Sequence, residues 1–144
     1  MDAERMRAYL LTLPHVTETM QWGANLVFWV GDKAHGGKMF AMINLDEPAA
    51  PELAGHKPRP VISYASSPMR FAELIEREDM IPAPYLARAH WVSALRWDTL
   101  ASTEWRNELV DAHGLVLAKL PAKIREALTA KAQPTPKRAA KAQR

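Results

Sequence analysis

The chain has 144 residues, 48% of them hydrophobic, which suits one domain with a buried core and is too few for two. It contains no cysteine, so a disulfide framework, a thiolate metal site and thiol catalysis are excluded. The formal charge is +3, but residues 131–144 hold five of the 19 basic residues and no acid. Residues 1–130 therefore carry 14 basic and 16 acidic residues, a net charge of about −2.

These numbers predict one domain over residues 1–130, followed by a basic, disordered tail over 131–144. No apolar run approaches the roughly 20 residues needed to cross a bilayer, and charged side chains occupy the N-terminus. We therefore expect a cytoplasmic protein without a membrane partner.

The N-terminal third is predicted to be a helix followed by strands. Residues 2–13 have apolar side chains at helical spacing, with an aspartate at the start and a proline after the end. Residues 17–22 and 26–30 are rich in β-branched and aromatic residues and predict strands. The glycine-rich stretch 31–37 then connects to a return strand at 38–45, which makes a β-hairpin.

The remainder is predicted to be mixed. Four prolines make residues 46–60 a long loop, after which 61–64 resumes a strand and 68–77 forms an amphipathic helix. Residues 91–97 alternate as a strand requires, and 102–130 is helical with a bend at its proline. The sequence predicts an α+β fold with an antiparallel sheet of about five strands covered by helices.

The early strands are apolar on both faces, as Phe28 and Trp29 illustrate, so the sheet needs a second covering layer. One interpretation has the C-terminal helices cover that second face. The other makes it a dimer surface or a ligand-binding surface, with monomer or homodimer left open.

No catalytic constellation emerges from the sequence. Gly31, Gly37 and Lys38 resemble a phosphate-binding loop, but the spacing is one residue too long, Met39 replaces the hydroxyl residue and a strand follows instead of a helix. No histidine has a second ligand at the short spacing typical of metal sites; the five are His15, His35, His56, His90 and His113. We expect neither an enzyme nor a metal or cofactor.

Basic and aromatic residues gather near the predicted strand ends. The candidate nucleic-acid contacts are Lys33, His35, Lys38, Lys57, Arg59, Arg88, Arg96, Lys137, Arg138, Lys141 and Arg144. The candidate aromatic pocket or interface consists of Trp29, Tyr64, Trp91 and Trp97. A plainer interpretation is that the lysines solvate a hairpin and the tryptophans fill the core.

Four segments, taken together, resemble the MmcQ/YjbR family of small bacterial proteins, also described as DUF419. They are Leu13-Pro14 with Gln21-Trp22-Gly23, then GKMFAMI at 37–43, IPAPYLARAHWVSAL at 81–95 and LVLAKLP at 115–121. The resemblance implies a double-wing fold similar to CyaY-like and secretion-chaperone-like proteins, with DNA as a partner. It supplies no catalytic residues, and Ala112-His113 stands where the family commonly has Ser-Tyr.

Two functions follow as hypotheses. The first is weak, non-specific DNA binding directed mainly at phosphates, because the tail concentrates basic residues. The second is a small-molecule or protein-binding module using an aromatic pocket or dimer surface on the sheet, because the body itself is slightly acidic.

Overall fold

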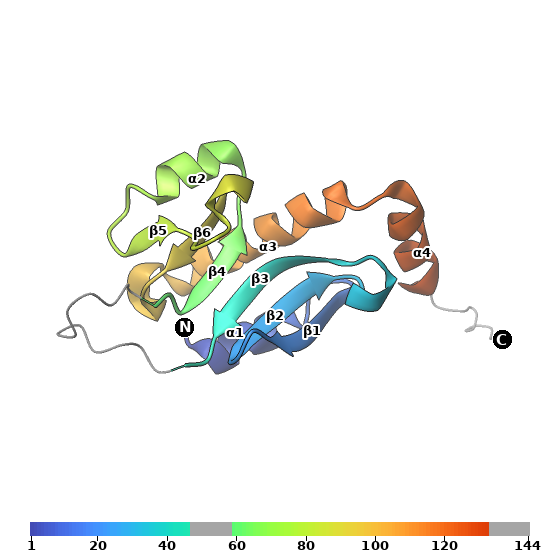
Figure 1. Ribbon diagram of the computed structural model, residues 1–144, viewed down its shortest axis with the longest axis horizontal. Helices are drawn as coiled ribbons and strands as arrows, with labels where there is room; N and C mark the ends of the chain where they lie inside the picture. The colour runs from blue at the N-terminus through green and yellow to red at the C-terminus, as the bar shows by residue number, and fades with distance from the viewer. Residues whose placement is uncertain (47–58, 133–144) are drawn as a thin grey trace.

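The structure is a computed structural model that describes residues 1–46 and 59–132. Its elements, shown in Figure 1, are α1 (Ala3–Leu10), β1 (Val16–Gln21), β2 (Asn25–Val30), β3 (Lys38–Asn44), β4 (Ile62–Ala65), α2 (Pro68–Leu74), β5 (Met80–Pro82), β6 (Trp91–Ala94), α3 (Ser102–Lys119) and α4 (Ala122–Ala132). Most of the predicted proline-rich loop and tail lie outside the described residues; α4 itself extends to residue 132.

One antiparallel sheet contains all six described strands, in the order β1-β2-β3-β4-β6-β5. The predicted α+β class with an antiparallel sheet is confirmed. The structure has one strand that was not predicted, β5, which has only three residues and ends in Pro82. Proline is tolerated there because β5 lies at the edge of the sheet. The predicted strand at 91–97 ends at Ala94, because Trp97 begins a 3₁₀ turn and its carbonyl accepts the indole proton of Trp105 at 2.9 Å.

Helices α1 and α3 cover one face of this sheet (Figure 1), and the core lies between them and the strands. Met6 of α1, Trp105 of α3 and Phe28 of β2 are all fully buried in one cluster. The two helices also touch each other, since the hydroxyl of Tyr9 donates to the carbonyl of Arg106 at 3.4 Å. This side of the sheet is therefore filled.

Helix α3 presents its buried residues at helical spacing along one stripe: Trp105, Glu108, Leu109, Ala112, His113 and Val116. His113 is fixed in this stripe at two points. Its Nε2 donates to the carbonyl of Pro14 at 2.7 Å, and its ring packs edge-on against Phe40 with centroids 5.4 Å apart. The histidine therefore joins α3 to the segment after α1 and to β3.

A β-bulge in β3 changes which side chains face the helices. Phe28 pairs with Ala41, but the next residue of β2, Trp29, pairs with Met39, so Phe40 is the extra residue. Phe40 and Ala41 are consecutive and both fully buried in the core. Met39 and Met42 consequently share the opposite face of the sheet, although they are three residues apart.

The glycine-rich connection between β2 and β3 is a hairpin, as predicted, and it receives helix α4. A Cβ atom on Gly36, whose φ is +89°, would lie 2.9 Å from Cδ1 of Ile124. A Cβ atom on Gly31, whose φ is +84°, would lie 3.5 Å from Cδ1 of Leu128. These glycines let the loop turn and let α4 approach it closely.

The C-terminal helices do not wrap the second face of the sheet. In the described parts of the chain, α3 lies on the core face and α4 lies beyond the β2–β3 hairpin, while α2 lies near β5 and β6 (Figure 1). The second face is partly covered by the turn at residues 84–86 instead. We call it the open face.

Candidate functional site

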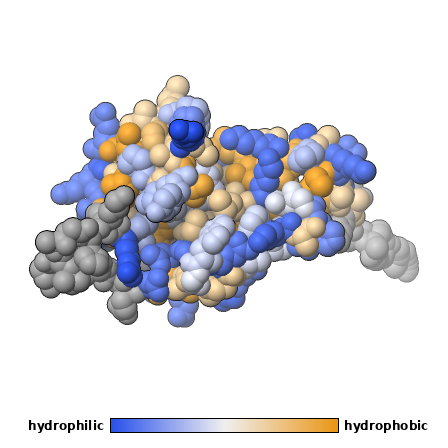
Figure 2. All heavy atoms as spheres, in the orientation of Figure 1, coloured by the Kyte–Doolittle hydropathy of each residue, from blue (hydrophilic) through white to orange (hydrophobic). Residues whose placement is uncertain are grey.

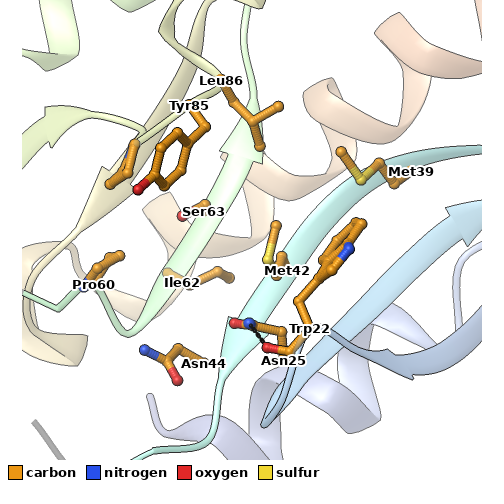
Figure 3. Close-up of a pocket in the computed structure, with 11 residues that line it drawn as sticks. Trp22, Asn25, Met39, Met42, Asn44, Pro60, Ile62, Ser63, Tyr85 and Leu86 are labelled. Carbon is orange, nitrogen blue, oxygen red and sulfur yellow. Dashed lines mark hydrogen bonds between the residues drawn. The ribbon is translucent and has the colours of Figure 1, made fainter.

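The open face contains a cavity of about 530 Å³ between the β2–β3–β4 part of the sheet and the segment after β5. Figure 3 shows its walls, with side chains from the strands on one side and Tyr85 and Leu86 on the other. The described residues that line it are Trp22, Asn25, Met39, Met42, Asn44, Pro60, Ile62, Ser63, Pro84, Tyr85 and Leu86. In Figure 2, apolar and near-neutral residues occupy the middle of this face, with hydrophilic residues at its margins.

Two exposed aromatic side chains stand on opposite sides of this cavity. Trp22 is 62% exposed and Tyr85 is fully exposed, although both are large aromatic residues. Both also have backbone φ in the left-handed region, +49° for Trp22 and +65° for Tyr85. Such a conformation costs a bulky residue energy and persists only where the surrounding chain imposes it.

The neighbouring backbone imposes both conformations. Trp22 lies in the β1–β2 turn beside Gly23, whose φ is also positive, and its carbonyl accepts from the Asn25 side chain at 2.9 Å. Tyr85 lies in a turn closed by the Leu86 amide, which donates to Ala83 O at 3.1 Å. The rings are therefore placed by turns and not by burial in the core.

The polar groups at the cavity are amides and hydroxyls. Asn25 and Asn44 are cross-strand partners on β2 and β3. Ser63 of β4 faces Ser93 of β6, and their hydroxyl oxygens lie 2.6 Å apart. The mutual hydrogen bond uses one of the two hydroxyl protons, and the other is free to reach a second acceptor. No lysine, arginine, aspartate or glutamate is among the described residues that line the cavity.

The aromatic residues predicted from the sequence lie elsewhere. Trp29 is 8% exposed, its Nε1 donates to Thr19 Oγ1 at 2.8 Å, and the Lys33 ammonium lies 5.5 Å from the centre of its ring. Trp91 is buried, and Trp97 packs against Trp105. None of the predicted set, Trp29, Tyr64, Trp91 and Trp97, is among the residues that line the cavity. These side chains are core or sheet-packing residues.

Tyr64 belongs to a buried polar network on the core side. Its hydroxyl donates to Glu108 Oε1 at 3.0 Å, and Arg70 Nε donates to Glu108 Oε2 at 2.9 Å. Burial, and then the neighbouring Glu108 carboxylate, raise the pKa of Tyr64 far above its usual range. The phenol therefore stays a hydrogen-bond donor, and the network ties β4, α2 and α3 together.

The predicted nucleic-acid residues are divided between different parts of the molecule. Lys33, His35 and Lys38 lie at the β2–β3 hairpin, where His35 Nδ1 contacts Asp32 Oδ2 at 3.0 Å. Arg96 follows β6 at the end that is in register with Ile62 and Ile43, which is the opposite end of β3 from Lys38. The structure therefore brings the hairpin residues together but separates them from Arg96.

The other predicted cations that the structure describes, Arg59, Arg88 and Arg96, do not join the group at the hairpin. The guanidinium of Arg96 is held by Asp98 through two hydrogen bonds of 2.8 and 2.7 Å, which raise the pKa of Arg96. Arg88 lies in a 3₁₀ turn at Ala87–Ala89, and Arg59 lies just before β4. Lys57 and the tail residues Lys137, Arg138, Lys141 and Arg144 lie outside the described residues.

The described chain has neither a cluster of metal ligands nor a helix suited to cross a membrane. Within residues 1–46 and 59–132, no three histidine, aspartate or glutamate side chains gather where a metal ion could be held. Over the same ranges, no helix combines the length and the apolar character that a membrane span requires.

The chain thus has a distinct architecture: an antiparallel sheet packed on helices at one face and bearing a cavity on the other. The model of the YjbR family matches residues 11–115, and this chain belongs to that family. The predicted MmcQ/YjbR membership is confirmed.

A solved structure supports the fold. The crystal structure of Deinococcus radiodurans protein DR2400, which has the family-model domain DUF419, is similar with a TM-score of 0.71 and 23% sequence identity. The similarity covers 89% of this chain and 88% of that one. No curated protein matches this chain.

Proposed function

We propose that this YjbR-family protein is a binding module and that the open-face cavity is its ligand site. The observation that carries this proposal is the pair of exposed aromatic residues, Trp22 and Tyr85, held at positive φ on two sides of a cavity of about 530 Å³. Backbone strain of this kind clusters at functional sites, because selection for stability alone would place glycine there. The volume suits a small molecule.

The proposed role is binding without catalysis. Among the described strand residues at the cavity, Ser63 alone has a hydroxyl, and its hydrogen-bond partner is the hydroxyl of Ser93 and not a histidine or a carboxylate. A serine nucleophile needs an adjacent base to take its proton. The described lining supports recognition by shape, stacking and a few neutral hydrogen bonds.

The test replaces Tyr85 with glycine and measures binding and stability together. Glycine adopts a φ of +65° without strain, so Tyr85→Gly should raise the free energy of unfolding by ~0.5–1 kcal/mol in urea titrations. The same variant should bind the neutral fluorescent probe N-phenyl-1-naphthylamine at least about fivefold more weakly, because one aromatic wall is gone.

The matched control is Asp79→Gly, which relieves a φ of +63° outside the cavity. It should leave probe binding unchanged. If the unchanged protein does not bind the probe, or if both glycine variants bind it like the unchanged protein, the cavity is not a ligand site.

We infer a second candidate function, phosphate-directed DNA binding, at the end of the molecule formed by the hairpin and α4. The observation that favours it is the packing of Ile124 and Leu128 of α4 on the hairpin glycines. This contact places α4 beside the hairpin that carries Lys33, His35 and Lys38, and the basic residues of the tail follow α4 in the sequence. Such clustering favours contacts to phosphates.

Salt-dependent titration of a labelled DNA duplex tests this second function. The double variant Lys33→Ala/Lys38→Ala should reduce the slope of log affinity against log salt by about two. The control, Arg5→Ala/Arg106→Ala, removes the same charge from the α1–α3 side and should leave the slope of the unchanged protein almost intact. Equal slopes for the two double variants, or no binding at low salt, would remove the hairpin from consideration.

A further inference from the structure

We propose that the cavity selects an uncharged planar ligand carrying a carboxamide or lactam group, which presents a hydrogen-bond donor beside an acceptor. This inference rests on the proposed ligand-binding function and specifies the chemistry of the ligand. The feature that carries it is the pair of asparagines at the cavity, Asn25 and Asn44.

Each asparagine has one half of its amide already engaged. Asn25 Nδ2 donates to the carbonyl of Trp22 at 2.9 Å, a bond drawn in Figure 3. Asn44 Oδ1 accepts from the backbone amide of Asp46 at 3.0 Å. A carbonyl partner requires a nitrogen and an N–H partner requires an oxygen, so these bonds fix the orientation of both amides.

The engaged atoms leave complementary ones for a ligand. Asn25 keeps Oδ1 as an acceptor, and Asn44 keeps the two protons of Nδ2 as donors. The two residues are directly opposite each other on β2 and β3, and cross-strand partners have Cβ atoms about 5 Å apart. A carboxamide or lactam, with an N–H beside a C=O, satisfies both groups at once.

The rest of the lining favours a neutral and planar ligand. Among its described residues there is no charged side chain to neutralise a carboxylate or an ammonium group, and a charge buried without a partner is costly. Trp22 and Tyr85 offer ring faces for stacking, and the thioethers of Met39 and Met42 adapt to the shape of a flat ring. Benzamide is the simplest probe with all these properties.

Selectivity follows from the cost of unpaired polar groups. A ligand without an amide displaces water from Asn25 and Asn44, and the hydrogen bonds between that water and the asparagines are lost. A ligand with an amide forms new hydrogen bonds in their place. Sites built to hydrogen-bond a ligand group discriminate strongly against analogues that lack it. The asparagines therefore make the cavity selective among aromatic molecules of similar size.

The experiment titrates the full chain with benzamide, benzoate and toluene and follows the indole Nε1–H signal of Trp22 by NMR, assigned with Trp22→Phe. Benzamide should bind about tenfold or more tightly than either of the other two probes. Asn44→Asp keeps the oxygen that accepts from Asp46 but loses the donor, so it should abolish most of the preference for benzamide over toluene. Asn107→Asp makes the same chemical change on the exposed side of α3 and should preserve the preference.

The outcomes separate the inference from the function on which it rests. If toluene and benzamide bind equally well to the unchanged protein, or if Asn44→Asp keeps the preference, the cavity binds ligands but the asparagine pair does not select them. If none of the three probes nor N-phenyl-1-naphthylamine binds, the ligand-binding function itself fails.

Discussion

Replacing Arg70 with methionine should lower the free energy of unfolding by ~2–3 kcal/mol, because the variant leaves the Glu108 carboxylate without its counter-charge. The Glu108 side chain is only 8% exposed, and Arg70 Nε lies 2.9 Å from its Oε2. Breaking a buried ion pair by removing one partner usually costs more than this. The cost expected here is smaller than for a fully buried pair, because the Arg70 side chain is 38% exposed and water partly screens its charge.

The chain provides a matched control in Arg77→Met. Arg77 and Glu104 are also 2.9 Å apart and the arginine is 39% exposed, but the Glu104 side chain is 42% exposed. This substitution should cost less than ~0.5 kcal/mol, because a solvated carboxylate does not need the arginine. Urea unfolding at pH 7 measures both variants, and equal costs would contradict the argument that burial of the glutamate decides the effect.

A double substitution tests the same argument from the other direction. Arg70→Met/Glu108→Gln removes the buried charge along with its partner, and the glutamine oxygen can still accept from Tyr64. The double variant should therefore recover most of the stability that Arg70→Met loses. A double variant as unstable as the single one would mean that the arginine contributes mainly through its packing.

This buried network explains why the two faces of the sheet differ. Tyr64 comes from β4, Arg70 from α2 and Glu108 from α3, so one polar cluster holds two helices against the strands. The apolar side chains of α3 pack into the core on the same side of the sheet. Helices α2 and α3 are thereby held away from the open face, which keeps its cavity.

The sequence predicts most of the fold because the strong elements have strong periodicity. The residues that become α1 and α3 are apolar at helical spacing, and those that become β2 and β3 form short apolar runs bounded by turn residues. Caps such as Asp2, which accepts from the amide of Arg5 at 2.8 Å, are visible as residue types. Strand β5 was not predictable, since three residues ending in proline have no periodicity. It forms because it pairs with the backbone of β6, which would otherwise be the edge strand of the sheet.

The cavity could not be predicted, because its composition depends on which face each side chain takes. Strict alternation places Met39 and Met42 on opposite faces, and only the bulge at Phe40 brings them together. Trp22 and Tyr85 occur in turn segments, beside glycine and proline, where an aromatic residue has no core to join. An aromatic residue at a turn is the one sequence signal that could have indicated them.

The predicted aromatic set lies apart from the cavity, for the converse reason. Trp29, Tyr64, Trp91 and Trp97 are conspicuous in strand-like segments, yet aromatic residues in strands are usually there to fill the core. Trp29 and Tyr64 each use their polar atom within the protein, on Thr19 and Glu108. DNA binding by the predicted basic residues, in contrast, stays a prediction.

Substituting alanine for Gly37 should lower the free energy of unfolding by ~2–3 kcal/mol, whereas alanine at Gly114 should raise it by ~0.5–1 kcal/mol. A Cβ on Gly37 would lie 2.6 Å from the carbonyl carbon of Gly31 and 2.8 Å from the carbonyl oxygen of Val30. These are backbone atoms of the hairpin and cannot rotate away, so the loop itself must shift. Gly114 lies inside α3, and in the described chain no atom beyond its neighbours and the backbone of its own helix lies within 4 Å of the added carbon. There alanine removes chain entropy from the unfolded state.

Because Ile124 and Leu128 of α4 pack on the same loop, the effect of Gly37→Ala should extend beyond the hairpin. Hydrogen exchange should show faster exchange of the α4 amides in Gly37→Ala than in the unchanged protein, and no change in Gly114→Ala. Unchanged exchange in α4 would show that the helix holds its place without the loop. Accelerated exchange would identify the hairpin loop, with Gly31 against Leu128 and Gly36 against Ile124, as the docking surface of α4. This role accounts for a glycine-rich sequence that resembles a phosphate-binding loop.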